Sequence, residues 1–191
     1  MQLLAPYREL AANPDLYYSR NHLWFKAMEE TNLWRAGIDS FAALLLGQVS
    51  DIIYPILQGR QDTGTRLVWI SHLDGLLGLK SPVPANALHG NRRLREHPAL
   101  LLSNPMDAGW LLEGDFDLAD DAIFLIPRTD LHVWFAQEIK WLGREVEQRL
   151  SRSSLPGLGE TLSDGGVYVT SICNALGPAG HQELLEQVMN L

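Results

Sequence analysis

The chain has 191 residues, of which 46% are hydrophobic and 20% are charged, with a formal net charge of -8. This composition provides enough apolar side chains for a packed core and excludes a disordered chain. The excess of carboxylates repels phosphate groups and anionic lipids, which disfavours nucleic acid as a partner and excludes a membrane surface. A single cysteine, Cys173, cannot form an internal disulfide, so we expect a reducing, cytoplasmic environment.

The length is typical of one domain, and we expect residues 1–191 to form a single domain. Residues 1–60 are predicted to be its helical N-terminal part and residues 65–191 its mixed α/β part. No run approaches the roughly 20 apolar residues of a membrane span, and the first residues lack the basic start of a secretion signal.

Three helices are predicted within residues 1–60. The first covers residues 3–12 and the second begins near Pro14, which suits a first helical turn. The third begins after a cap at Asp39 and should kink or end at Pro55. The apolar stripes of the second and third helices are Leu16, Leu23, Trp24, Ala27 and Met28, and Phe41, Leu45, Val49, Ile52 and Ile56.

Four short apolar runs predict strands, at residues 67–70, 110–112, 122–126 and 167–172. The run at 67–70 is apolar on both faces, which is typical of a central strand. Between the first two runs, residues 86–97 predict a short basic helix, and residues 178–190 predict a closing helix.

The most regular pattern follows the run at 122–126. Apolar residues then recur at spacings of three and four from Leu131 to Leu150, which predicts one long amphipathic helix. A helical N-terminal third, followed by a small sheet of about four strands packed on this helix, indicates an α+β fold, with α/β as the alternative.

Polar residues directly after the run at 67–70 form the first candidate site. His72 can act as an acid or base or as a metal ligand, and Asp74 can orient it or balance its charge, if both converge on one pocket. Cys173 is a third candidate, as a nucleophile that would need a nearby histidine. The structural alternatives are a helix cap for Asp74 and a buried thiol for Cys173.

A second candidate is the basic cluster of Arg92, Arg93 and Arg95, because the planar guanidinium group binds phosphate or carboxylate through two parallel hydrogen bonds. The alternative is a solvated run paired with surface carboxylates. The acidic segment 115–121 departs from the calcium-loop template, with Asp120 where glycine is needed. We therefore predict no metal site and no cofactor.

The function expected from these features is that of a non-catalytic cytoplasmic interaction protein, a regulatory protein being one form of it. It rests on the absence of nucleotide-binding and nucleophile motifs, and its partner would be a protein or a small ligand. The first alternative is a small hydrolase-like enzyme using His72 and Asp74, with or without Cys173. A weaker alternative is a DNA-binding regulator through residues 41–60, although residues 41–59 contain no lysine or arginine.

Overall fold

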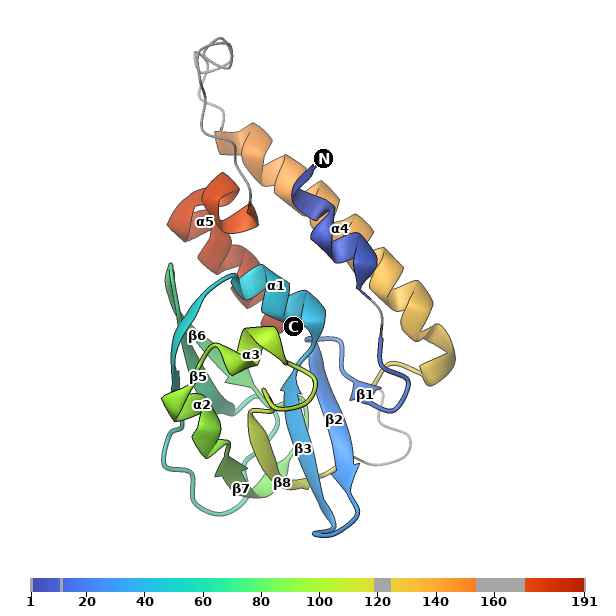
Figure 1. Cartoon of the computed structure of the whole chain (residues 1–191), viewed down its shortest axis with the longest axis vertical. Helices are drawn as coiled ribbons and strands as arrows, with labels where there is room; N and C mark the ends of the chain where they lie inside the picture. The colour runs from blue at the N-terminus through green and yellow to red at the C-terminus, as the bar shows by residue number, and fades with distance from the viewer. Residues whose placement is uncertain (1, 11, 119–124, 154–170, 191) are drawn as a thin grey trace.

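The computed structural model describes residues 2–10, 12–118, 125–153 and 171–190. Two antiparallel sheets occupy one end of the molecule, and two long helices extend from them to the other end (Figure 1). The first sheet has the order β1-β2-β3-β8-β7 and contains β1 (Tyr17–Tyr18), β2 (Leu23–Met28), β3 (Leu33–Ile38), β7 (Ala85–Gly90) and β8 (Leu112–Phe116). The second has the order β4-β5-β6 and contains β4 (Val49–Ile53), β5 (Arg66–His72) and β6 (Gly75–Lys80).

Helices connect and cover these sheets. The α-helices are α1 (Ser40–Leu46), α2 (Arg92–Glu96), α3 (Leu100–Ser103), α4 (Leu131–Ser153) and α5 (Ile172–Met189). Short 3-10 helices are η1 (Gln2–Leu4), η2 (Pro6–Glu9) and η3 (Arg128–Asp130). The combination of helices with purely antiparallel sheets confirms the α+β class.

The predicted helical N-terminal third is wrong, because residues 17–38 form three strands of the first sheet. Leu23, Trp24 and Phe25 are consecutive and all buried, so β2 lacks the alternation that distinguishes a half-buried strand. His22 and Asn32 both have a φ of 58°, a left-handed conformation that no helix interior contains. Residues 3–12, also expected to be helical, hold only the 3-10 helices η1 and η2.

The third predicted helix starts where expected but is shorter. The Asp39 carboxylate caps α1 by accepting a hydrogen bond from the N–H of Ala42 at 2.9 Å. Gly47, with a φ of 70°, ends the helix, and residues 49–53 are the strand β4. The DNA-binding alternative requires a second helix within residues 41–60. Because the strand β4 stands in its place, this alternative is wrong.

Several later elements are confirmed. The run at 67–70 lies in β5, the central strand of its sheet. The long helix is α4, and the closing helix is the second half of α5, which begins after a break at Gly177 with a φ of 67°. The run at 110–112 leads into β8, while the basic helix predicted over 86–97 is only α2, because residues 85–90 are β7.

Two predicted strands cannot be compared in full. Residues 122–124 of one and 167–170 of the other lie outside the described residues. Ile172, expected at the end of a strand, is instead the first residue of α5.

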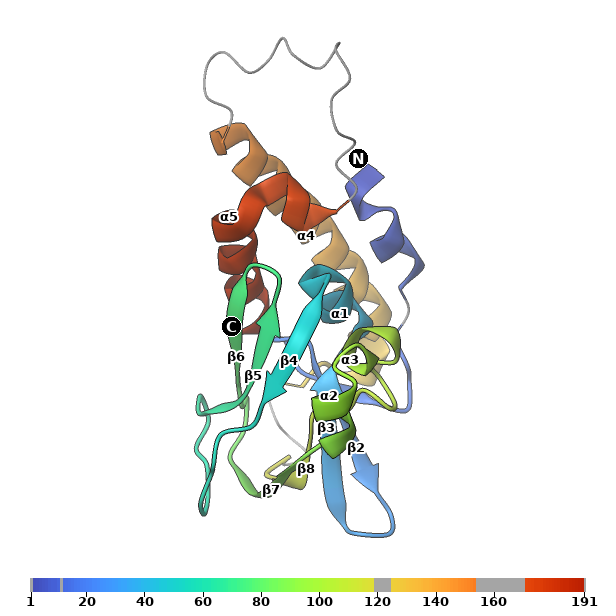
Figure 2. The same ribbon diagram turned by 60° about the vertical axis from the view of Figure 1, so that its left-hand side comes forward.

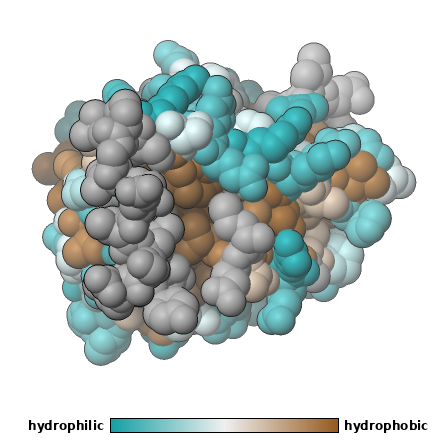
Figure 3. Space-filling view, turned by 90° about the horizontal axis from the view of Figure 1, so that it is seen from above, coloured by the Kyte–Doolittle hydropathy of each residue, from teal (hydrophilic) through white to brown (hydrophobic). Residues whose placement is uncertain are grey.

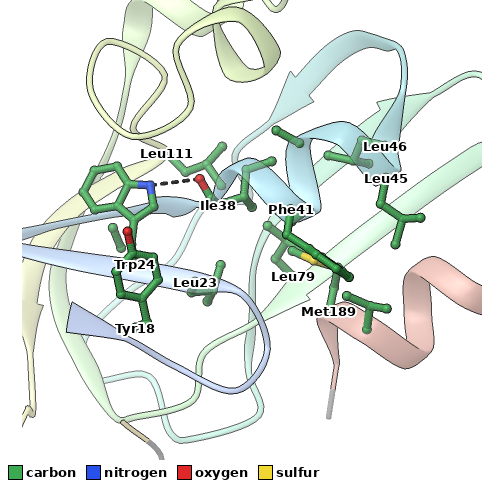
Figure 4. Close-up of a cluster of buried hydrophobic side chains, with 14 of the residues drawn as sticks. Tyr18, Leu23, Trp24, Ile38, Phe41, Leu45, Leu46, Leu79, Leu111 and Met189 are labelled. Atoms are coloured by element: carbon green, nitrogen blue, oxygen red, sulfur yellow. Dashed lines mark hydrogen bonds between the residues drawn. The ribbon is translucent and has the colours of Figure 1, made fainter. Parts of the chain in front are cut away.

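The core joins both sheets to α1, α4 and α5 (Figures 1 and 2). Figure 4 shows part of it, with Phe41 of α1 beside Leu79 of β6 and Met189 of α5. The indole N–H of Trp24 donates to the carbonyl of Ile38 at 2.9 Å. A Cβ atom at Gly37 would lie 2.7 Å from the Trp24 ring, so this strand position requires glycine.

Hydrophobic side chains also lie between hydrophilic ones on the face seen from above in Figure 3. None of the helices in the described part of the chain has an apolar stretch long enough to cross a membrane.

Candidate functional site

The tip of the β5–β6 hairpin lies against α5. His72 is paired with Gly75 across the hairpin, so Leu73 and Asp74 form a two-residue loop. The hairpin and α5 run side by side in Figures 1 and 2. Leu73 is 61% exposed and Leu76 is 44% exposed, so apolar side chains flank the loop on the surface. The tip therefore combines an exposed apolar edge with a polar cluster beneath it.

His181 of α5 is the buried centre of that cluster. Its Nδ1 lies 2.6 Å from Oδ2 of Asp74, and its Nε2 lies 2.7 Å from the carbonyl oxygen of Leu45. Because a carbonyl oxygen only accepts, Nε2 carries a hydrogen and donates it to Leu45. A second proton must lie between Nδ1 and the Asp74 carboxylate, so His181 and Asp74 share a proton.

His72 is held in one tautomer. The side-chain N–H of Gln182 donates to the carbonyl of Leu76 at 3.3 Å, which leaves Oε1 of Gln182 facing Nε2 of His72 at 2.8 Å. Nε2 of His72 is therefore the donor, and Nδ1 is the acceptor, receiving the backbone N–H of Asp74 at 3.4 Å. Burial lowers the pKa of His72 below its usual 6.5; the Gln182 hydrogen bond opposes this and the nearby His181 adds to it.

His72 and Asp74 lie in one cluster, which contains a third residue, His181, that was not among the residues predicted from the sequence. The Asp74 carboxylate bonds His181 rather than His72. The alternative role of Asp74 as a helix cap is wrong, because β6 follows it. One signal was present in the sequence, a lone histidine inside the apolar helix predicted over 178–190.

Cys173 does not belong to this cluster. Its Sγ lies 3.1 Å from the hydroxyl oxygen of Ser171 and close to Gly47 at the end of α1. Its hydrogen-bond partners are Ser171 and Asn174, and no histidine of the described residues is among them. Within the part of the chain that the structure describes, Cys173 thus has no general base.

The arginine cluster lies on α2, an element separate from the β5–β6 tip. Arg92 and Arg95 line a surface hollow of about 430 Å³ together with Tyr54 and His89. The Arg95 guanidinium lies 5.6 Å from the centre of the Tyr54 ring, a cation–π contact. Among the ion pairs of the described residues, none involves Arg92, Arg93 or Arg95. Their predicted role as a ligand-binding patch stays a prediction.

A second buried histidine joins three distant segments. Nδ1 of His22 lies 2.8 Å from Oδ2 of Asp39, and its Nε2 lies 3.8 Å from Oε2 of Glu138 on α4. The ring stacks on Phe41 at 4.3 Å between centroids. Burial lowers the pKa of His22, but the two carboxylates outweigh burial and raise it to about 9. His22 is therefore a buried cation that holds α4 against α1.

Comparisons with known proteins add a relationship that the motifs do not reveal. No family model matches the chain. A glycine cleavage system H protein of Listeria innocua is 30% identical over 99 residues, which cover 52% of this chain and 78% of that protein. One from a Mycobacterium species (strain KMS) is 31% identical over 107 residues, covering 56% of this chain and 80% of that protein.

A solved structure shares the fold. The crystal structure of a glycine cleavage system H protein from Mycobacterium marinum superposes with a TM-score of 0.55 at 20% identity, and the match covers 66% of this chain and 98% of that one. About a third of this chain therefore has no counterpart in that structure.

These relatives overturn the function expected from the sequence. An unspecified interaction or regulatory protein is wrong as a description, because the relatives are components of a named system. The hydrolase-like alternative and the DNA-binding regulator have no support among them. The comparisons assign no role to His72, Asp74, Cys173 or the three arginines.

Proposed function

Since this chain belongs to the family of glycine cleavage system H proteins, we propose that it acts as an H-type component of a glycine cleavage system. It works by docking on the other proteins of that system. The observation that carries this proposal is the sequence match, which spans more than three quarters of the Listeria innocua relative. A cytoplasmic location and protein partners from that system are part of the proposal.

Membership of this family implies a lipoyl group, and the lysines of the chain decide whether it can carry one. Lipoate is a carboxylic acid that proteins carry as an amide, so its attachment needs a lysine amine. The whole sequence contains three lysines, Lys26, Lys80 and Lys140. A group that must visit several active sites needs an amine that projects from the protein on a free turn.

None of the three lysines has that position. Lys26 lies within β2 and pairs with Arg35 across the hairpin, and Lys140 lies in the middle of α4. Lys80 is half-buried at the end of β6, where its backbone N–H bonds the side chain of Asn190. The lysines of this chain therefore do not fit a projecting lipoyl arm, and docking is the part of the H-protein role that we assign to it.

The β5–β6 tip is the docking surface in this proposal. It presents the apolar side chains of Leu73 and Leu76 on a two-residue loop, and α5 supports it from behind through Gln182 and His181. An exposed apolar side chain on a rigid support loses little conformational entropy on binding. Leu73, at 61% exposure, is the residue we expect to contribute most.

Direct binding tests this role. The purified chain should bind at least one other protein of a glycine cleavage system in surface plasmon resonance, and Leu73→Asp should weaken that binding by about tenfold or more. Ile56→Asp is the matched control, because Ile56 is 92% exposed on a different segment, and it should bind like the wild type. Equal binding by both variants would remove the tip from the docking surface, and no binding by the wild type would remove the proposed function.

A further inference from the structure

We propose that His72, Asp74 and His181 bind one divalent transition-metal ion of the zinc class at the β5–β6 tip. No metal site was predicted from the sequence, in which His181 lies more than a hundred residues after His72 and Asp74. The proposal goes beyond the docking role, which requires no metal. It uses only the side chains of the cluster described above.

The three residues offer a compact set of ligand atoms. One donor atom from each residue lies within 4.8 Å of the donor atoms of the other two. Tetrahedral coordination with bonds of about 2.0–2.1 Å places ligand atoms roughly 3.4 Å apart. The widest separation must then close by roughly 1.4 Å, and the 2.6 Å contact between His181 and Asp74 must open by roughly 0.8 Å. Side-chain rotation covers shifts of this size.

Both histidines are already oriented in the way that metal ligands are. A metal-bound histidine characteristically donates the N–H of its other ring nitrogen to a carbonyl or carboxylate oxygen. Nε2 of His181 donates to the carbonyl of Leu45 at 2.7 Å, and Nε2 of His72 donates to Oε1 of Gln182 at 2.8 Å. In each ring the nitrogen left for a metal is Nδ1.

Binding would cost few existing interactions. Nδ1 of His72 gives up only the long 3.4 Å contact with the backbone N–H of Asp74. Between His181 and Asp74, the ion replaces the shared proton, which leaves to solvent, so one proton is released for each ion bound. Burial lowers the pKa of His72, which favours the neutral ring, whose lone pair can bind a metal.

The ligand types select the class of ion. Two imidazoles and one carboxylate suit Zn²⁺, Co²⁺ or Ni²⁺, whereas Mg²⁺ and Ca²⁺ prefer sets of oxygen atoms. Three protein ligands leave a fourth position for water or an anion. The ion can enter from solvent, because the loop between His72 and Gly75 is at the surface, with Leu73 largely exposed.

Titration of the full chain with Co²⁺ tests the site. After treatment with a chelator, the wild type should bind one equivalent and develop the intense visible absorption of tetrahedral Co²⁺, which Zn²⁺ should then displace. Calorimetry in buffers of different ionisation enthalpy should show the release of a proton. An absorption no stronger than that of aqueous Co²⁺ at saturating metal would overturn the proposal.

Variants separate the site from surface histidines and from folding. His72→Ala and Asp74→Asn should each abolish the visible band, while Gln182→Ala, which removes the hydrogen-bond partner of His72 but no ligand, should weaken Co²⁺ binding by about 10–100-fold. His132→Ala is the matched control, because His132 is exposed on α4, and it should bind like the wild type. Circular dichroism confirms that each variant is folded. Unchanged binding by folded His72→Ala and Asp74→Asn would also overturn the proposal.

Discussion

At the scale of single residues, two buried histidines hold the helical end of the molecule to its sheets. His181 joins α5 to the tip of the β5–β6 hairpin and to the end of α1, while His22 joins the start of α1 to α4. Each is paired with an aspartate through Nδ1. Nε2 of His181 also donates to the carbonyl of Leu45, whereas Nε2 of His22 has no hydrogen-bond partner and only faces Glu138 at 3.8 Å. The two ends of α1 are thereby fixed by different histidines.

The charge of His22 makes stability depend on pH. Its pKa of about 9 in the folded protein exceeds the usual 6.5, so folding favours the protonated ring. The resulting stabilisation is fully present below about pH 6.5 and is lost as the pH rises through about 9. The free energy of unfolding should fall by up to roughly 3 kcal/mol over this range, measured by urea denaturation at several pH values.

A variant isolates the contribution of His22. His22→Gln should have a lower free energy of unfolding than the wild type at pH 6.5. Between pH 6.5 and 9, its free energy of unfolding should fall much less than that of the wild type. His132→Gln, at an exposed position on α4, should keep the wild-type profile. If the His22→Gln profile had the same slope as that of the wild type, the buried cation would not be its cause.

At the scale of elements, α4 stabilises the fold through one face. Phe135 is 4% exposed and its ring meets the ring of Tyr18 edge to face at 5.7 Å. Phe135→Ala should lower the free energy of unfolding by about 3–5 kcal/mol, because it loses apolar burial and leaves a cavity. Arg144→Ala, on the exposed face, should change it by no more than about 0.5 kcal/mol. Equal losses in urea melts would mean that the other face of α4 is buried.

The elements that were predicted well from the sequence are those in which the apolar residues follow a clear pattern. In α4, the apolar residues keep a helical spacing over the whole element, and one face packs on the core while the other is solvated. In β5, a short continuous apolar run indicated a strand covered on both sides, and it is the central strand of its sheet.

In the elements that were predicted wrongly, the spacing of the apolar residues is compatible with both a helix and a strand. In β2 the consecutive burial of Leu23, Trp24 and Phe25 left no alternation, so a helical stripe could be drawn through the same residues. After α1, the stripe continued through Val49 and Ile52 although Gly47 had already ended the helix. A left-handed glycine cannot be distinguished by sequence from one tolerated inside a helix.

At the scale of the whole molecule, the site depends on contacts that local patterns cannot show. The sequence placed His72 and Asp74 correctly at the end of a central strand, but their partners come from α5, more than a hundred residues later. Pairing across such a separation follows from the tertiary fold. The same holds for His22, whose carboxylate partners lie 17 and 116 residues away along the sequence.

The family relationship and the lysine positions together support the role that we propose for the molecule. About half of the chain is similar in sequence to glycine cleavage system H proteins, and two thirds of it share the fold of one, yet its three lysines lie on strands and on a helix. Its projecting hairpin tip instead carries Leu73 and Asp74, and Asp74 is bonded to α5. These features favour a component that occupies an H-protein docking place without a lipoyl arm of its own.

Competition in a reconstituted glycine cleavage system tests this central claim most directly. The measurement is the rate of glycine cleavage by purified components with a lipoylated H protein, as increasing amounts of this chain are added. We predict that the chain, treated beforehand with a lipoate-attaching enzyme, supports no cleavage by itself and lowers the rate in a dose-dependent way that Leu73→Asp relieves. Cleavage supported by this chain alone, or a rate unaffected by a large excess of it, would contradict the account.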